Sequence, residues 1–272
     1  MPVDEAVREG VIDIARQAAA AILEVYAGEF EVERKDDASP VTAADMAAHH
    51  VIVDGLRALT PQIPVLSEEC ADEVAAAERL RWPRLWLVDP LDGTREFVKR
   101  NGEFSVNIAL IEDGVATFGV IQQPVTGTLW FGAPGGGAWM RDGASERALH
   151  AGRPQAEGPL RVAASRSHRD GRTAALMERI GAIDPVALGS SLKFCWLAEG
   201  RMDVYPRFGP TSEWDTAAGQ AILEGAGGIL VDPRGRPFRY NQRETILNGD
   251  FIALGDPSLP WRSWVGSEEF PG

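Results

Sequence analysis

The chain is poor in cysteine, in long apolar runs and in positive charge, and each shortage excludes a class of protein. Its 272 residues include only two cysteines, Cys70 and Cys195, which cannot form a disulfide framework and fit a reducing compartment. No run of about 18 apolar residues occurs, so no segment is expected to span a bilayer. Acidic side chains interrupt the N-terminal apolar residues, whereas a secretory signal is basic and then continuously apolar. We therefore expect a cytoplasmic chain, with peripheral contact to the inner membrane face left open.

The charge balance is strongly acidic. Lys and Arg together number 27 and Asp and Glu number 40, which gives a formal net charge of −13. Proteins that bind nucleic acid need Lys and Arg to meet phosphate, so we expect no nucleic-acid partner. A small phosphorylated substrate remains compatible with this charge if cations or local basic side chains line its site. The 44% apolar and 25% charged residues are ordinary for a globular protein and exclude a disordered chain.

The first half of the chain reads as two helices followed by a largely antiparallel sheet. Apolar residues at helical spacing predict a helix over residues 7–25. A capping-box pattern at Thr42 and Asp45 predicts the start of the second helix, and Pro61 ends that region. Strands are expected at residues 63–66, 85–88, 105–111, 115–121, 128–131 and 138–140, with Asp113-Gly114 as a hairpin turn.

The second half alternates strands and helices, which favours an α/β lobe. The expected strands cover residues 160–164, 186–188, 202–205 and 229–231, and the expected helices cover residues 173–180, 191–198 and 216–226. Gly and Pro in residues 152–158 indicate a hinge between lobes. We predict an N-terminal α+β lobe over residues 1–155 and a C-terminal α/β lobe over residues 156–272.

Two carboxylates, Asp89 and Asp92, come directly after the apolar strand at residues 85–88. Side chains at the carboxyl end of a strand are common in α/β sites. Two acids so close together repel each other, and no Lys or Arg lies between them. Mg²⁺ resolves this conflict because it takes oxygen ligands, to which the backbone carbonyl of Leu91 could add one more. The alternative is a polar turn in which Asp92 or Thr94 caps a helix.

Three further segments carry acids at the boundaries of predicted elements, and each acid has an ordinary structural alternative. Asp215 at a helix start could be an N-cap, Glu68 and Glu69 could be a solvated surface pair, and Asp45 could serve only its capping box. If these acids converge, they form a multi-metal phosphoryl-transfer site. The Thr94 hydroxyl could then orient a water molecule, and the N–H groups at Gly93 and Thr94 could bind a phosphate.

These motifs resemble the paired signature of the inositol monophosphatase superfamily. The segments that carry the resemblance are Asp89-Pro90-Leu91-Asp92-Gly93-Thr94 and Trp214-Asp215-Thr216-Ala217-Ala218-Gly219, preceded by Ser67-Glu68-Glu69. The resemblance implies a layered αβαβα sandwich of two lobes and a Mg²⁺-dependent, lithium-sensitive phosphatase with two or three ions.

Further segments narrow the resemblance to the bacterial 3′(2′),5′-bisphosphate nucleotidases of the CysQ type. They are residues 39–45, 65–69, 96–104, 165–168, 189–194 and 205–207. The likeness extends from about residue 15 to about residue 254 and leaves residues 261–272 without an assigned role. It implies hydrolysis of the 3′-phosphate of adenosine 3′,5′-bisphosphate to AMP and phosphate, in sulfur assimilation and nucleotide recycling.

The same resemblance implies roles for individual residues. The metal ligands would be Glu68, Asp89, the Leu91 carbonyl, Asp92 and Asp215. The catalytic group that activates the attacking water would be Asp45 and Thr94, together with Glu68. The nucleotide would be held by Gly93, Thr94, Ser165, His168, Ser190, Lys193, Arg207 and Asp215. The sequence does not settle the oligomeric state.

Three alternatives stand beside this hypothesis. The same metal site could serve an inositol monophosphatase or a fructose-bisphosphatase. A phosphatase that forms an aspartyl-phosphate begins with Asp-x-Asp-Gly-Thr, but here two residues separate Asp89 from Asp92, so the geometry of the nucleophile would differ. An inactive nucleotide-binding module is the third alternative, although every expected type of ligand is present.

Overall fold

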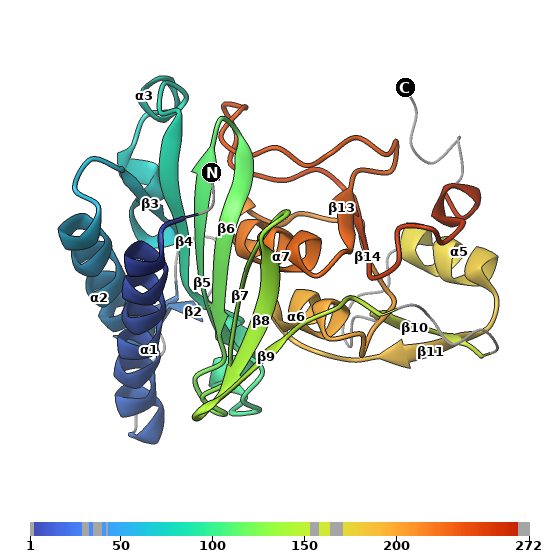
Figure 1. Cartoon of the computed structure of the whole chain (residues 1–272), viewed down its shortest axis with the longest axis horizontal. Coiled ribbons are helices and arrows are strands. Elements are labelled where there is room, and N and C mark those ends of the chain that lie inside the picture. Colours follow the sequence, from blue (N-terminus) through green and yellow to red (C-terminus); the bar gives the residue numbers. More distant parts are fainter. Residues whose placement is uncertain are drawn as a thin grey trace.

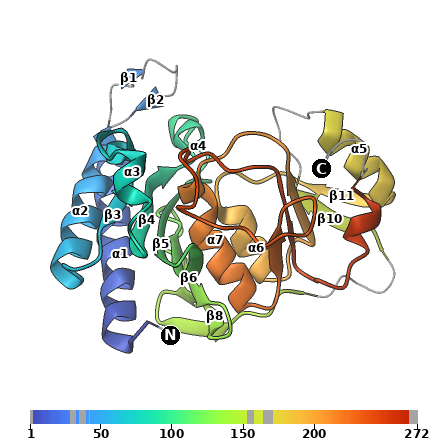
Figure 2. The ribbon, with the colours of Figure 1, turned by 90° about the horizontal axis from the view of Figure 1, so that it is seen from above.

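Helices and sheets alternate in layers across the molecule, as seen in Figure 1 and, from above, in Figure 2. The computed structural model describes residues 3–28, 33–34, 40–41, 43–152, 158–163 and 171–265. From one side to the other, the layers are the pair α1 and α2, a large sheet, the pair α6 and α7, a smaller sheet, and α5. This order of layers confirms the αβαβα sandwich expected from the resemblance.

The large sheet is almost entirely antiparallel. In the described part of the chain its order is β3-β4-β5-β6-β7-β8-β9, and only β3 and β4 pair in parallel. The strands are β3 (Val65–Ser67), β4 (Arg84–Asp92), β5 (Ser105–Glu112), β6 (Val115–Gln122), β7 (Leu129–Ala133), β8 (Gly137–Asp142) and β9 (Ser145–Ala148). Asp113 and Gly114 between β5 and β6 both have positive φ, as the predicted hairpin turn requires.

Two long amphipathic helices cover one face of this sheet. They are α1 (Glu5–Ala27), which begins at an Asp4 N-cap, and α2 (Ala43–Leu59). Their buried faces form one core with the strands that they cover, which includes Ile12 and Ile52 from the helices and Val88 from β4. Trp86 of β4 is also part of this core and donates its ring N–H to the Thr60 hydroxyl at 2.8 Å.

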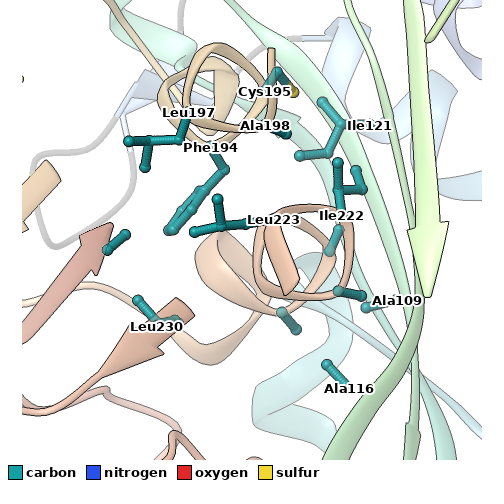
Figure 3. Close-up of a cluster of buried hydrophobic side chains, with 14 of the residues drawn as sticks. Ala109, Ala116, Ile121, Phe194, Cys195, Leu197, Ala198, Ile222, Leu223 and Leu230 are labelled. Atoms are coloured by element: carbon teal, nitrogen blue, oxygen red, sulfur yellow. The ribbon is translucent and has the colours of Figure 1, made fainter. Parts of the chain in front are cut away.

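The second helix pair lies between the two sheets, as Figure 1 shows. It consists of α6 (Leu192–Ala198) and α7 (Glu213–Gly225). Figure 3 shows apolar side chains of both helices facing Ala109 and Ile121 of the large sheet. The approach is so close that a Cβ atom on Gly219 would lie 2.3 Å from the Phe194 ring. The small residues after Asp215 therefore allow tight packing.

The smaller sheet mixes parallel and antiparallel pairs. Among the described residues its order is β11-β10-β12-β14-β13, with β14 antiparallel to both neighbours. The strands are β10 (Leu160–Ala163), β11 (Ile183–Val186), β12 (Val204–Arg207), β13 (Ile229–Val231) and β14 (Phe251–Leu254), and α5 (Gly171–Ile180) covers the outer side. The remaining short elements are β1 (Glu33–Arg34), β2 (Pro40–Val41), η1 (Glu68–Glu73), α3 (Ala76–Arg79), α4 (Thr94–Val98) and η2 (Trp261–Ser263).

Several expected boundaries were wrong. β4 does not stop at Asp89 but continues to Asp92, and α7 begins three residues earlier than expected. β11 replaces the strand expected at residues 186–188, and β9 and β14 were not expected at all. The division between residues 155 and 156 lies outside the described part of the chain and stays a prediction. No helix in the described ranges is both long and apolar enough to cross a membrane.

Candidate active site

The first two acids lie at the end of a buried strand. β4 pairs regularly with β5 as far as Asp89, which is opposite Asn107, and the register then shifts before Asp92. The N–H of Leu91 donates to a carboxylate oxygen of Asp89 at 3.0 Å inside this irregularity. Pro90 has no N–H to offer to the neighbouring strand, which explains why the register breaks here. Both acids lie at the carboxyl end of β4.

Asp89 is the electrostatic centre of the acidic cluster. Burial raises the pKa of Asp89 well above its ordinary value of 3.8, because a charged carboxylate loses its hydration. The negative charges of four other carboxylates raise this pKa further: Glu68, Asp92, Asp215 and Asp45. These acids come from β4, the start of η1, α7 and α2. The structure therefore brings together the separated acidic segments that the sequence analysis singled out.

Asp92 is held from across the molecule. The backbone N–H of Ser191, just before α6, donates to Asp92 at 2.5 Å, and the Asn107 side chain donates at 3.5 Å. The Ser191 hydroxyl donates in turn to Asn107 at 2.7 Å. Burial raises the pKa of Asp92, and the positive charge of Lys193 is the strongest influence in the opposite direction. Asp92 is thus a buried acid with fixed partners on two sides.

Asp215 lies in the first turn of α7, but it is not the N-cap that the sequence suggested. Ser212 is the N-cap, and its backbone N–H donates to the Asp215 carboxylate at 2.8 Å in a capping box. Burial raises the pKa of Asp215 well above its ordinary value, and the charges of Asp92 and Glu68 raise it further. One carboxylate oxygen of Asp215 therefore accepts a hydrogen bond within its own helix, while the charges of Asp92 and Glu68 act on the same carboxylate.

Two basic side chains lie near these acids. Lys193 donates to the backbone carbonyls of Leu188 at 3.2 Å and Ser190 at 2.7 Å, and burial lowers the pKa of Lys193 to about 8. Arg207 donates to the Pro210 carbonyl at 3.2 Å, and its charge lowers the pKa values of both Lys193 and Asp215. Arg207 therefore lies close enough to the cluster for its charge to act on both Lys193 and Asp215.

The remaining predicted residues divide into those beside the cluster and those outside the described part. A Cβ atom on Gly93, which has φ +91°, would lie 3.2 Å from the Cβ of Ser190, so these two segments touch. Thr94 donates its hydroxyl to the Leu91 carbonyl at 3.4 Å. Ser165 and His168 lie outside the described residues, as does the capping residue Thr42.

Sequence reasoning did not find the groups that hold these acids in place. Ser191 is 99 residues from Asp92, so no local pattern connects them. His49, one helical turn after Asp45, pairs its Nδ1 with the Ser67 hydroxyl at 2.9 Å and so links α2 to the segment that carries Glu68. The only local signal for this contact was the four-residue spacing of Asp45 and His49, which places both on one face of a helix.

The donor set fits hard divalent cations. Within the described ranges, no three acidic, histidine or cysteine side chains are arranged as direct ligands of one ion. Mg²⁺ does not require such a cage, because it keeps several waters and is bound by one or two carboxylates at a time. The buried carboxylates raise each other's pKa values, because their negative charges repel one another where hydration is lost. Bound cations would relieve this repulsion.

Comparison with known proteins decides the family. The model of the inositol monophosphatase family matches residues 4–255. The chain belongs to the inositol monophosphatase family. Membership agrees with the layered fold and with the acids gathered at the end of β4.

Close relatives within the inositol monophosphatase family carry a more specific name. The 3′(2′),5′-bisphosphate nucleotidase CysQ of Salmonella typhimurium is 50% identical over 245 residues, which is 89% of this chain and 97% of the relative. CysQ of Escherichia coli K12 is 49% identical over 243 residues, covering 89% and 96%. The crystal structure of CysQ from Bacteroides thetaiotaomicron matches with a TM-score of 0.77 and 40% identity, covering 90% of this chain and 96% of that one.

Proposed function

We propose that this chain is a 3′(2′),5′-bisphosphate nucleotidase that hydrolyses the 3′-phosphate of adenosine 3′,5′-bisphosphate to give AMP and phosphate. The observation that carries the proposal is the half-identical match to CysQ proteins over 96–97% of their length. The buried acids around Asp89 supply the site at which such a phosphatase acts. In this proposal the enzyme works in the cytoplasm, in sulfur assimilation and nucleotide recycling.

Two or three Mg²⁺ ions fit the proposed site. The residues that would hold them are Glu68, Asp89, the Leu91 carbonyl, Asp92 and Asp215. When bound, the ions would neutralise charge on the phosphate and lower the pKa of a water molecule. The charges of acids from separate segments all act on Asp89, and this closeness supports the assignment.

The chain's own residues orient the water and the substrate. Asp45 and Glu68 lie beside Asp89, and Thr94 is anchored on the Leu91 carbonyl, so these groups can direct a water molecule for in-line attack. Because the water attacks the phosphorus directly, no covalent phosphoenzyme forms.

The proposed contacts to the nucleotide come from both halves of the chain. Gly93, Thr94 and Asp215 would face the reacting phosphate, while Lys193 and Arg207 would supply positive charge to the second phosphate. The influence of both cations on the pKa values of the buried acids supports their place at this site. Ser190 lies against Gly93. Ser165 and His168 complete the proposed contacts from the segment outside the described residues.

A phosphate-release panel tests the proposal. The purified chain is incubated with Mg²⁺ and adenosine 3′,5′-bisphosphate, its sulfated analogue, an inositol monophosphate or fructose 1,6-bisphosphate. We expect the highest kcat/KM for adenosine 3′,5′-bisphosphate and no release in EDTA. A higher kcat/KM for the inositol or fructose substrate would contradict the proposed substrate, and absence of release from all four would contradict the enzyme assignment.

A further inference from the structure

A long connection between β13 and β14 contacts Arg79 at the end of α3 and Glu213 at the start of α7. The segment between β13 and β14 runs back across the molecule toward the large sheet, as Figure 1 shows in orange and red. The N–H of Tyr240 in this connection donates to the Gly114 carbonyl of the β5–β6 hairpin at 3.0 Å. The next residue, Asn241, is 3% exposed and has φ +51°. This connection therefore contains a residue whose side chain is polar and buried and whose backbone is in the left-handed region.

Asn241 bridges the segment after Glu68 to the start of α7. Its side-chain amide donates to the Arg79 carbonyl at 2.6 Å, and its side-chain oxygen accepts from the Arg79 guanidinium at 2.9 Å. Its backbone N–H donates to the Glu213 carboxylate at 2.7 Å. Arg79 ends α3, shortly after η1 begins at Glu68, and Glu213 comes two residues before Asp215. One asparagine thus links the end of α3, which follows η1 in the chain, to the first residue of α7, the helix that carries Asp215.

The two ends of this bridge are buried charged groups. Arg79 is 4% exposed and Glu213 is fully buried. Glu213 also accepts from the Arg243 guanidinium at 2.8 Å, so its negative charge is compensated. Removing a hydrogen-bond partner of such a buried charged group is costly, because the group stays buried with that bond unmade. The network can therefore hold its two segments at a fixed separation.

The same connection also secures the turn around Asp215. The side-chain amide of Asn248 donates to the Ser212 carbonyl at 2.7 Å, and Glu213 donates its N–H to the Ile246 carbonyl at 2.9 Å. Ser212 is the residue whose N–H orients the Asp215 carboxylate. A shift of the connection would therefore move the capping box and the acid with it.

We propose that Arg79, Asn241 and Glu213 are positioning residues that set the separation of Glu68 from Asp215 and thereby tune divalent-cation binding. The inference rests on the proposed function, because it takes Glu68 and Asp215 as metal ligands. None of the three residues needs to touch the ion or the substrate. Removal of residues that orient the metal ligands without binding the ion typically lowers metal affinity by roughly 10- to 100-fold.

Two variants separate positioning from simple electrostatics. Arg79→Met removes a positive charge, which by Coulomb attraction alone would leave cation binding unchanged or strengthen it. Asn241→Gly changes no charge and keeps a residue that adopts positive φ freely. We expect both variants to weaken binding of Mn²⁺, a spectroscopically visible substitute for Mg²⁺, by about tenfold or more. Electron paramagnetic resonance of the EDTA-stripped, dialysed protein measures free and bound Mn²⁺ without substrate.

Arg161→Met is the matched control. Arg161 makes an ion pair with buried Asp203 at 2.6 Å in the smaller sheet, away from the connection. Arg161→Met should lower Tm, because it removes an ion pair, but it should keep Mn²⁺ affinity within twofold of that of the original chain. Unchanged affinity in Asn241→Gly would overturn the proposal, as would an equal loss in Arg161→Met. If Arg79→Met does not fold, Asn241→Gly decides.

A separate assay protects the inference from failure of the proposed function. The original chain and Asn241→Gly are tested for phosphate release from adenosine 3′,5′-bisphosphate at saturating Mg²⁺. If the original chain binds Mn²⁺ but releases no phosphate, the proposed function fails while the positioning result stands. If the chain is active and Asn241→Gly binds Mn²⁺ normally, only the positioning proposal fails.

Discussion

Asp92 and Asp215 reach the same site on different supports. Asp92 ends β4 inside the large sheet, and its partners, Ser191 and Asn107, come from elsewhere in the fold. Asp215 lies in the first turn of α7 and accepts a hydrogen bond from Ser212 of the same turn. The strand acid is held by tertiary contacts, whereas the helix acid is held by a local motif whose frame is secured from outside.

The two acids also differ in how their charge is compensated. The positive charge of Lys193 is the largest influence that lowers the pKa of Asp92. For Asp215, the backbone N–H of Ser212 has the largest lowering effect, and the charge of Arg207 is weaker than the repulsion from Asp92. The site therefore combines one acid with a nearby counter-charge and one acid that depends on a dipole. We therefore expect bound cations to stabilise the second acid more than the first.

Replacing either acid by its amide tests this difference and is the largest expected effect. Asp92→Asn and Asp215→Asn should each lower kcat by about 10³-fold, the upper range for loss of one preorganised electrostatic group. Their effects on the metal-free protein should differ. Asp215→Asn removes a buried acid that Asp92 and Glu68 repel and should raise Tm in EDTA. Asp92→Asn removes the strongest of the carboxylate charges that act on buried Lys193 and should not raise Tm.

Steady-state kinetics at saturating Mg²⁺ and thermal unfolding in EDTA provide the two measurements. Near-normal kcat in either variant would remove that acid from the proposed ligands. Equal Tm changes in both variants would show that Lys193 does not compensate Asp92. The original chain, carried through the same EDTA treatment, is the reference for both comparisons.

The fold was predictable wherever one segment carried its own signal. The helical spacing before residue 28 and the Asp113-Gly114 turn are local patterns, and both appear in the structure. The end of β4 was missed because continuation of a strand through Pro90 depends on the neighbouring β5, not on local preference. β14 was missed because it pairs with β12 and β13, which lie well before it in the chain, so no short hairpin turn marks it in the sequence.

The candidate site was predictable as a set of acids but not as an arrangement. Position at the boundary of a predicted element, together with the family resemblance, was enough to single out Asp89 and Asp215. The contacts around the acids required the fold: Ser191 donates to Asp92 from 99 residues away, and the network proposed to position Asp215 joins Asn241 to Arg79 across 162 residues. Hydrogen bonds between such distant residues leave no periodic pattern in a single sequence.

An intermediate effect is expected for Lys193, whose role can be divided between the substrate and the protein. Lys193→Met keeps the length of the side chain and removes its charge. If Lys193 meets the second phosphate, KM for adenosine 3′,5′-bisphosphate should rise about tenfold, the lower end for a lost charged hydrogen bond. KM for adenosine 3′-monophosphate, which lacks that phosphate, should change much less. Equal rises for both substrates would assign Lys193 to holding the Leu188 and Ser190 carbonyls instead.

The smallest expected effect is a pH dependence of stability that only the metal-free protein shows. Burial and neighbouring carboxylates raise the pKa of Asp89 above its ordinary value of 3.8, so the folded chain binds this proton more tightly than the unfolded chain. The resulting stability is fully present below pH 3.8 and is lost as pH rises through the folded pKa. Asp89→Asn removes the titrating group and should flatten this part of the profile.

Thermal unfolding in EDTA across mildly acidic to mildly alkaline pH measures the difference between the two chains. Each kcal/mol corresponds to about 2–4 °C in Tm for a chain of this size, so the two profiles should separate by a few degrees. Mg²⁺ should stabilise the original chain most at the alkaline end, because metal ligands must be deprotonated. Parallel profiles would mean that Asp89 titrates normally, and the repulsion that we assign to the cluster would then be absent from the folded protein.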